Sequence, residues 1–206
     1  TLYQANMRVY NLLRYPVKVQ LSPGSPHEDV HLIDWRNPEN NDFALAEEVT
    51  LKGGHERRPD LVVYLNGIAI AIIELKRSSV EVGDGIRQLI SNQEKIFNQD
   101  FFATSQLLLA GNDSQGLRYG TTGTPEQFYV QWKDENGTNE HTPGTLLDQP
   151  LAQICEKGRL LDLIYNFIIF DAGQKKVPRQ HQFFGIKAAQ TRIAEREGGV
   201  IWHTQG

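Results

Sequence analysis

The stretch RPDLVVYLNGIAIAIIELKR, residues 58–77, decides the fold of this chain. It contains two apolar runs joined by an Asn-Gly pair, a strong short-range signal for a β-hairpin. Both runs are apolar at nearly every position, which predicts strands in the middle of a sheet that is covered on both faces. The hairpin nevertheless carries Asp60 at one end and Glu74 and Lys76 at the other. A buried charge is costly unless it is paired or binds a metal, so these residues form either a structural ion pair or a site.

The length of the turn decides whether the three charged residues share one face of the hairpin. Glu74 and Lys76 are two positions apart and therefore project from the same face of a strand. A two-residue loop at residues 66–67 leaves Asp60 on the face opposite Glu74. A three-residue loop over residues 65–67, or a bulge elsewhere in the hairpin, brings Asp60 to the same face. The sequence allows either arrangement.

On one face, Asp60, Glu74 and Lys76 would suit phosphate chemistry. Two carboxylates close together repel each other unless a divalent cation lies between them. Oxygen ligands with open water positions select Mg²⁺ or Mn²⁺, which activates a water and offsets charge on a phosphate under attack. Lys76 would add a positive charge that holds the attacking water or the phosphate. In the structural alternative, Glu74 and Lys76 pair at the strand exit and Asp60 ends a turn after Pro59.

Composition limits the class of protein. With 206 residues, of which 39% are hydrophobic and 22% charged, the chain suits one globular domain plus a smaller appendage. Its net charge of −4 lacks the basic excess that marks many nucleic-acid-binding domains. Short basic runs are candidate patches, although a solvated face is the default interpretation of each. They are His55, Arg57 and Arg58; Lys76 and Arg77; and Lys175, Lys176 and Arg179.

Cysteine content and hydropathy indicate the compartment. Cys155 is the only cysteine, which excludes an intramolecular disulfide and a cysteine-based zinc cluster and fits a reducing compartment. No apolar run reaches the roughly 18 residues needed to cross a bilayer, and the first residues lack the apolar segment of a signal peptide. We therefore expect a cytoplasmic chain with no membrane partner. The chain starts without methionine and ends mid-pattern, so we expect a piece of a longer protein.

Hydrophobic periodicity around the hairpin predicts an α/β fold. The expected helices cover residues 3–14, 82–102, 159–171 and 181–197. The expected strands besides the hairpin cover residues 30–35, 105–112, 116–124, 126–133 and 200–206, while residues 43–51 fit either type. A hairpin followed by a helix and further strands favours a mixed sheet with helices on its faces. Polar residues 134–144 predict a domain boundary, and residues 172–180 predict a second linker.

Pro59-Asp60 followed by Glu74-Leu75-Lys76 resembles the PD-(D/E)xK signature of metal-dependent nucleases. Two wider segments resemble the N-terminal endonuclease domain of the type I restriction enzyme R subunit: HERRPDLVVYLNGIAIAIIELKRSSVEVGDGIRQ and LLLAGNDSQGLRYGT. The last residues, GGVIWHTQG, resemble the strand and first glycine of the P-loop that opens the helicase motor of that subunit. The resemblance covers most of the chain from about residue 30 onward.

The resemblance implies a restriction-endonuclease-like mixed β-sheet core flanked by helices, with a C-terminal helical segment that leads into a helicase domain. The implied parts are an endonuclease domain over residues 1–144 (core about 30–133), a helical linker over 145–178 and the incomplete start of the ATPase motor over 179–206. Gln182 matches the position of an adenine-reading glutamine in such motors. The P-loop lysine would lie beyond Gly206, so ATP is expected to bind only the full-length subunit.

The resemblance also implies roles for residues of the nuclease domain. Asp60 and Glu74 would bind Mg²⁺, and Lys76 would be the catalytic lysine. Gln88 falls where related nucleases carry a Gln-xxx-Tyr motif, but position 92 is Asn here. Gln88 therefore either supports the active site and DNA or lies on a solvated helix face. A further upstream acid of these nucleases has no clear match in this sequence.

The function implied is Mg²⁺-dependent hydrolysis of phosphodiester bonds in double-stranded DNA, coupled in the intact complex to ATP-driven DNA translocation. Sequence recognition would belong to a specificity (S) subunit, and a methyltransferase (M) subunit would be the other partner. Two alternatives remain: a non-catalytic docking module between the motor and the methyltransferase core, and a structural cap on the helicase fragment. The intact set of Asp60, Glu74 and Lys76 favours the nuclease, because a scaffold gains nothing from buried charges.

Overall fold

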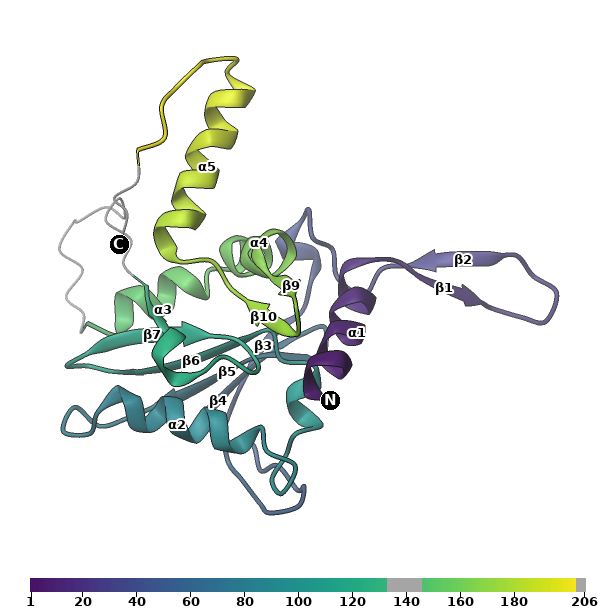
Figure 1. Cartoon of the computed structure of the whole chain (residues 1–206). Helices are drawn as coiled ribbons and strands as arrows, with labels where there is room; N and C mark the ends of the chain where they lie inside the picture. Colours follow the sequence, from purple (N-terminus) through teal and green to yellow (C-terminus); the bar gives the residue numbers. More distant parts are fainter. Residues whose placement is uncertain (133–145, 203–206) are drawn as a thin grey trace.

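A computed structural model describes residues 1–132 and 146–202 of the chain. At its centre lies a six-stranded sheet in the order β3-β4-β5-β6-β7-β8 (Figure 1). These strands are β3 Phe43–Glu47, β4 Leu61–Leu65, β5 Ile68–Leu75, β6 Leu107–Asn112, β7 Gly116–Gly120 and β8 Val130–Gln131. All neighbours run antiparallel except β5 and β6, which are parallel and are joined through helix α2 (Val82–Asn92). The predicted mixed sheet flanked by helices is confirmed.

Helices cover both faces of this sheet (Figure 1). α2 lies on one face, and α3 (Asp148–Ile154) and α4 (Lys157–Phe167) lie on the other. Successive residues of β5 alternate between the two sides. Ile72 packs in the apolar cluster that contains α2, whereas Ile73 packs with residues of α4. Glu74 therefore belongs to the α2 side of the sheet.

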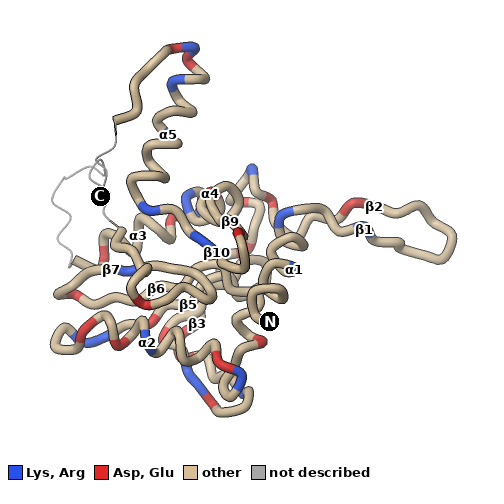
Figure 2. Tube along the Cα trace, in the orientation of Figure 1, with Lys and Arg blue, Asp and Glu red and all other residues tan. Residues whose placement is uncertain are grey.

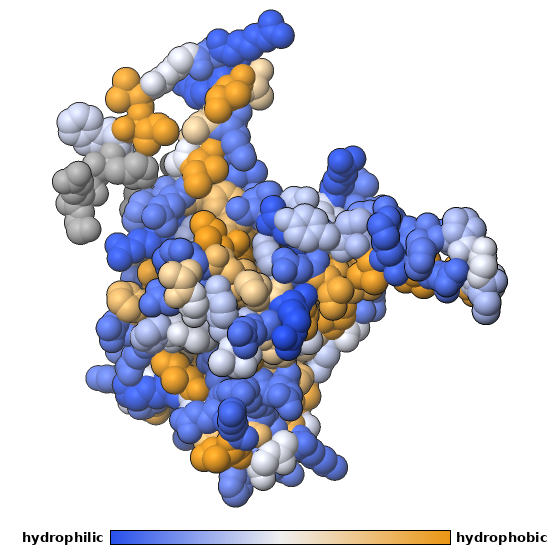
Figure 3. Space-filling view, turned by 45° about the vertical axis from the view of Figure 1, so that its right-hand side comes forward, coloured by the Kyte–Doolittle hydropathy of each residue, from blue (hydrophilic) through white to orange (hydrophobic). Residues whose placement is uncertain are grey.

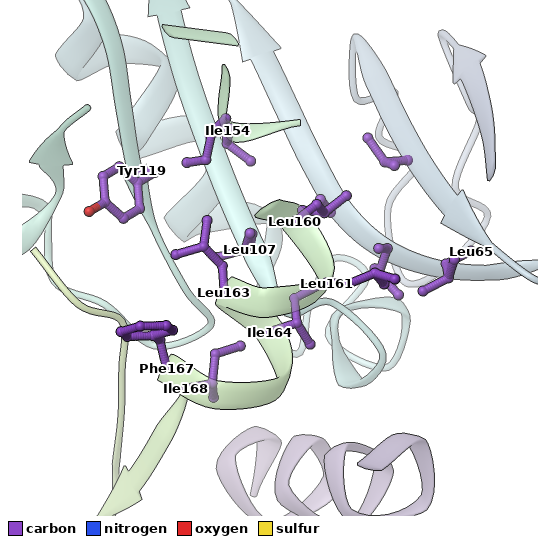
Figure 4. Close-up of a cluster of buried hydrophobic side chains, with 14 of the residues drawn as sticks. Leu65, Leu107, Tyr119, Ile154, Leu160, Leu161, Leu163, Ile164, Phe167 and Ile168 are labelled. Carbon is purple, nitrogen blue, oxygen red and sulfur yellow. The ribbon is translucent and has the colours of Figure 1, made fainter. Parts of the chain in front are cut away.

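The larger apolar core lies between the sheet and α4, and Figure 4 shows side chains of α4 among those of the strands. Tyr10 of α1 (Leu2–Arg14) and Phe183 of α5 (Gln180–Ala194) also belong to it. The buried residues of α4 are Leu160, Leu161, Leu163, Ile164 and Phe167. Part of the predicted helical linker thus contributes to the core of the sheet domain. The predicted boundary over residues 134–144 lies outside the described residues, and the division at residue 178 stays a prediction.

α2 is shorter than the helix predicted over residues 82–102. It ends at Asn92, and the Gln93 side chain holds the turn that follows. Its Nε2 donates to the Leu89 carbonyl at 2.9 Å, and its Oε1 accepts from the Gly123 N–H at 2.8 Å. The prediction is wrong beyond Asn92, because the apolar residues that continued the helical pattern belong to turns and to the short 3-10 helix η2 (Phe101–Ala103).

A two-stranded hairpin projects from the body of the molecule (Figure 1). Its strands, β1 (Val17–Gln20) and β2 (His27–Val30), pair only with each other among the described residues. The strand predicted over residues 30–35 is wrong beyond Val30. There the Asp34 carboxylate accepts the backbone N–H groups that follow it, at 3.0 Å each, which turns the chain.

Other strand predictions are confirmed in part. Residues 43–51, which fitted either type, form β3 over their first half. The strand predicted over 105–112 is β6, while those predicted over 116–124 and 126–133 shorten to β7 and β8. The intervening chain turns because Thr124 Oγ1 accepts the Thr121 N–H at 3.0 Å.

The C-terminal third departs most from the sequence expectation. The helix predicted over residues 159–171 ends at Phe167, and a second small hairpin replaces the predicted linker. Its strands are β9 (Ile169–Asp171) and β10 (Gln174–Lys176). Ala172 and Gly173 form its turn with φ of 46° and 82°. An alanine at positive φ is uncommon, so the sequence carries no signal for this turn.

Further differences concern the last residues and the basic run at 175–179. α5 ends at Ala194 rather than at residue 197, and residues 200–202 form no strand. The rest of that predicted strand lies outside the described residues. Lys175 is buried, so the predicted basic patch is wrong at this position. The β9–β10 hairpin turns its side chain against the start of β6, where it donates to Gln106 Oε1 at 2.8 Å.

Apolar side chains stay exposed along α5 and the segment after it (Figure 3). They include Ile186, Ile193, Ile201 and Trp202. A groove of about 620 Å³ between α5 and the β9–β10 hairpin is lined mostly by apolar residues. Within residues 1–132 and 146–202, no helix has both the length and the hydrophobicity to cross a membrane.

Candidate active site

The turn of the β4–β5 hairpin has two residues. Asn66 and Gly67 have φ of 50° and 79°, the backbone of a type I′ turn. The Asn66 side chain fixes this turn, because its Oδ1 accepts the Asp42 N–H at 2.7 Å and its Nδ2 donates to the Leu32 carbonyl at 2.8 Å. The three-residue turn is therefore not formed. By itself, a two-residue turn would leave the predicted acids on opposite faces.

A bulge in β5 corrects the register. Tyr64 lies opposite Ala69, as the two-residue turn requires, but Val63 lies opposite Ala71. Ile70 is therefore an extra residue on β5. A one-residue slip exchanges the two faces of a strand, so every residue of β5 beyond the bulge lies on the face opposite to the one that the turn alone would give.

The bulge brings the predicted acids together. Leu61 pairs with Ile73, so the next position places Asp60 against Glu74. The Asp60 carboxylate is anchored because its Oδ2 accepts the Leu75 N–H at 2.7 Å. Its backbone carbonyl accepts the Glu48 N–H at 2.8 Å. The condition that the sequence left open is met by a bulge rather than by a longer turn.

Gln88 joins Glu74 to Lys76. Its Nε2 donates to Glu74 Oε2 at 2.8 Å, and its Oε1 accepts from Lys76 Nζ at 2.6 Å. Lys76 Nζ also lies 3.7 Å from Glu74 Oε2. The amide thus uses both of its ends to hold one carboxylate and one ammonium in a fixed relation. The solvated-face alternative for Gln88 is wrong, because this half-buried side chain points into the site.

Close approach of α2 to the sheet makes this contact possible. A Cβ atom placed on Gly85 would lie 3.2 Å from the Ala110 Cβ and 3.5 Å from the Lys76 Cγ and Cε. The first of these distances is tighter than normal packing, so a larger residue would push α2 away from the sheet. The glycine therefore lets Gln88, one turn later on the same helix, reach the end of β5.

The electrostatics of Glu74 are unusual. Its side chain is fully buried, and one oxygen, Oε1, has no hydrogen-bond partner among the described residues. The pKa of Glu74 is raised to about 8, first by burial and then by the neighbouring Asp60 carboxylate, while the Lys76 ammonium opposes the shift. A buried oxygen without a partner is rare in folded proteins and calls for a physical reason.

The donor set of Asp60 and Glu74 fits a hard divalent cation. Two adjacent carboxylates with one unsatisfied oxygen supply the ligands and negative charge that Mg²⁺ or Mn²⁺ prefers. No cluster of three or more His, Cys, Asp or Glu side chains occurs in the described part of the chain. A cation here would therefore take its other ligands from water, backbone or substrate, as Mg²⁺ commonly does.

Other candidate residues lie elsewhere. Gln182 is on α5, across the sheet from α2, and its Oε1 accepts the Arg179 N–H at 2.8 Å at the start of that helix (Figure 1). Asn92, at the tyrosine position of the related motif, is fully buried. The sequence allowed a bulge in the hairpin without locating it. It gave one signal for the close approach of α2 at Gly85, a glycine inside a predicted helix.

Comparison with known proteins adds the family. Residues 1–127 match the family described as the N terminus of the type I restriction enzyme R protein. The chain belongs to this family. The resemblance inferred from the hairpin and its surroundings is thereby confirmed.

The relatives carry the same description. The chain is 31% identical over 202 residues to a protein of Methanocaldococcus jannaschii that is provisionally named type I restriction enzyme MjaVIIIP endonuclease subunit. The match covers 89% of this chain and 19% of the relative. It is 26% identical over 223 residues to the type I restriction enzyme HindI endonuclease subunit of Haemophilus influenzae, covering 98% of this chain and 21% of the relative. The chain thus spans about a fifth of the length of these two curated relatives.

Proposed function

We propose that this chain is the DNA endonuclease domain of a type I restriction enzyme R subunit. It hydrolyses phosphodiester bonds of double-stranded DNA with Mg²⁺, and in the intact complex this cleavage is coupled to ATP-driven translocation. The observation that carries the proposal is the convergence of Asp60, Glu74, Lys76 and Gln88 around a buried carboxylate oxygen that has no partner. The names of the relatives support it.

Each residue has a role that its contacts support. Asp60 and Glu74 would hold Mg²⁺, which supplies an activated water and offsets charge on the phosphate. Lys76 keeps its ammonium beside the acids through Gln88 and stays partly exposed, so it can hold the attacking water or a phosphate oxygen. The Leu75 N–H fixes the Asp60 carboxylate and limits its motion. Because these side chains are already held in place, they need not reorganise as the reaction proceeds.

The proposed partners are double-stranded DNA and the M and S subunits, and the full-length subunit would bind ATP with Gln182 near the adenine. A net charge of −4 suits a domain whose DNA is held mainly by the motor and the partner subunits. The alternative, a non-catalytic docking module, is disfavoured by Glu74. A buried carboxylate with an unsatisfied oxygen destabilises the fold, and a docking module would not need it.

The test uses the full-length subunit assembled with its partners. Lys76→Ala is expected to lower DNA cleavage by about 10²–10³-fold while DNA-stimulated ATP hydrolysis on the same preparation is unchanged. Lys18→Ala is the matched control, because Lys18 is exposed on the β1–β2 hairpin and pairs with Asp29 at 2.9 Å. Cleavage by Lys76→Ala at the rate of the control would refute the proposal.

A further inference from the structure

An open depression borders the candidate active site. It has a volume of about 580 Å³ and is lined by Arg57, Arg87, Gln88 and Ser91. Gln88 is the residue that binds Lys76 and Glu74, so one side chain separates the depression from the acids. Charged residues of both signs are mixed along α2 and the neighbouring loops (Figure 2), so the region is no continuous basic face. Any attraction for an anion must come from individual side chains.

Arg57 is held in place without a carboxylate partner. Its backbone pairs with Leu51, with the Arg57 N–H donating at 3.2 Å and the Arg57 carbonyl accepting at 2.8 Å. Its guanidinium carbon lies 3.8 Å from the centroid of the Phe97 ring. Stacking of this kind fixes the plane of a guanidinium and leaves its N–H edge free to donate. Within residues 1–132 and 146–202 the Arg57 guanidinium forms no ion pair.

Arg87, on the same depression, is the opposite case. Its guanidinium bonds to the Asp84 carboxylate at 2.6 Å and to the Glu126 carboxylate at 2.5 Å. Two carboxylates around one guanidinium leave that end of the depression with net negative charge. The Ser91 hydroxyl donates to the Gln88 carbonyl at 3.0 Å. Arg57 is therefore the cationic donor of this depression that remains available to an anion.

We propose that Arg57 binds a non-reacting phosphate of the DNA strand that is cut, next to the phosphate held at Asp60, Glu74 and Lys76. This inference rests on the proposed function. Arginine suits the role because its planar fork matches two oxygens of one phosphate. Contacts of this kind fix the position of the nucleic acid and carry no sequence information. Arg57 is thus a positioning residue and takes no part in the chemical step.

The experiment measures single-turnover DNA cleavage as a function of salt in the full-length subunit assembled with its partners. Arg57→Met keeps the apolar contact with Phe97 and removes the charge. It is expected to lower the cleavage rate about tenfold and to reduce the slope of log rate against log salt by about one, as for one lost phosphate contact. Arg57→Lys retains the charge and is expected to keep the wild-type slope with a smaller loss of rate.

Arg36→Met is the matched control. Arg36 is exposed and lies just before the short helix η1 (Pro38–Asn40). Glu39 of η1 pairs with Lys157 of α4 at 2.6 Å, so Arg36 lies on the α4 side of the sheet, away from the depression beside α2. DNA-stimulated ATP hydrolysis should be unchanged in all three variants. Cleavage by Arg57→Met with the rate and salt slope of Arg36→Met would overturn the inference, as would Arg57→Lys with the reduced slope of Arg57→Met. Lys76→Ala separates the two failures, since its cleavage at the wild-type rate would refute the proposed function itself.

Discussion

Glu74 at the end of β5 and Lys175 in β10 are both buried charged residues, yet their surroundings differ. Lys175 Nζ donates to three acceptors: the Ser105 carbonyl at 3.2 Å, the Gln106 carbonyl at 3.4 Å and the Gln106 Oε1 at 2.8 Å. Its three donor positions match three oxygens. Glu74 has one bonded oxygen, one without a partner and a second carboxylate beside it. Burial of a charge alone therefore does not mark a site. The distinguishing feature of Glu74 is a second carboxylate beside a buried carboxylate oxygen that has no partner.

The largest expected difference between the two residues is in DNA cleavage. Glu74→Gln keeps the shape of the side chain and removes the charge that would hold the cation. In the full-length subunit with its partners, we expect cleavage to fall by at least about 10²-fold. Lys175→Met should leave cleavage by the folded protein unchanged. Equal cleavage by both variants would remove the distinction between the two residues.

The pH dependence of stability should have opposite signs for the two residues. The pKa of Glu74 is raised to about 8, so the folded chain keeps this proton where the unfolded chain, with a pKa near 4.5, has lost it. The contribution of Glu74 is therefore fully present below about pH 4.5 and is lost as pH rises to about 8, by at most about 1.4 kcal/mol per pH unit. Urea unfolding of this chain with chelator present, for wild type and Glu74→Gln, measures the difference.

Burial lowers the pKa of Lys175, which reverses the sign. Between the folded pKa and the ordinary value near 10.5, the unfolded chain binds a proton that the folded chain does not, so stability rises with pH. Lys175→Met should abolish this rise. It should also lower the free energy of unfolding at neutral pH by about 1–3 kcal/mol, because the carbonyls of Ser105 and Gln106 and the Gln106 Oε1 lose their donor. A variant with wild-type stability and wild-type pH dependence would show that Lys175 is not held as described.

The smallest effects on cleavage and stability are expected for the two glutamines that bond to these charged side chains, Gln88 and Gln106. Gln88→Leu should lower cleavage about tenfold, or about 1.4 kcal/mol in the barrier, because Lys76 and Glu74 lose their bridge while both remain present. Gln106→Leu should leave cleavage unchanged and reduce the free energy of unfolding, because Lys175 loses one acceptor. Both variants are assayed for cleavage and for urea unfolding. Reduced cleavage by Gln106→Leu together with normal cleavage by Gln88→Leu would contradict the assignment of Gln88 to the active site.

The sequence predicted the hairpin and its acids because three charged residues at the mouth of an apolar hairpin break the pattern of a core strand. It did not locate the bulge. The run from Ile68 to Ile73 consists of alanine and isoleucine only, which pack acceptably in either register. The choice at Ile70 is made by the neighbours of β5 in the folded sheet. The shared face of Asp60 and Glu74 thus depends on tertiary structure.

The same limit explains the residues that were misplaced. Lys175 belongs to a basic run in the sequence, and only the β9–β10 hairpin, which turns at an alanine with positive φ, buries it. Gln88 was ambiguous because its direction depends on how closely α2 approaches the sheet at Gly85. Local patterns identify the elements, whereas these contacts depend on how the elements are packed.

The most direct test of the difference between the two buried charges is cation binding. Mn²⁺ would be titrated into the nucleotide-free full-length subunit at pH 8 and followed by electron paramagnetic resonance, for wild type, Glu74→Gln and Lys175→Met. We predict that wild type and Lys175→Met bind one Mn²⁺ that Glu74→Gln does not. Equal Mn²⁺ binding by all three proteins would show that Glu74 is not a cation ligand, and the account of this site would be contradicted.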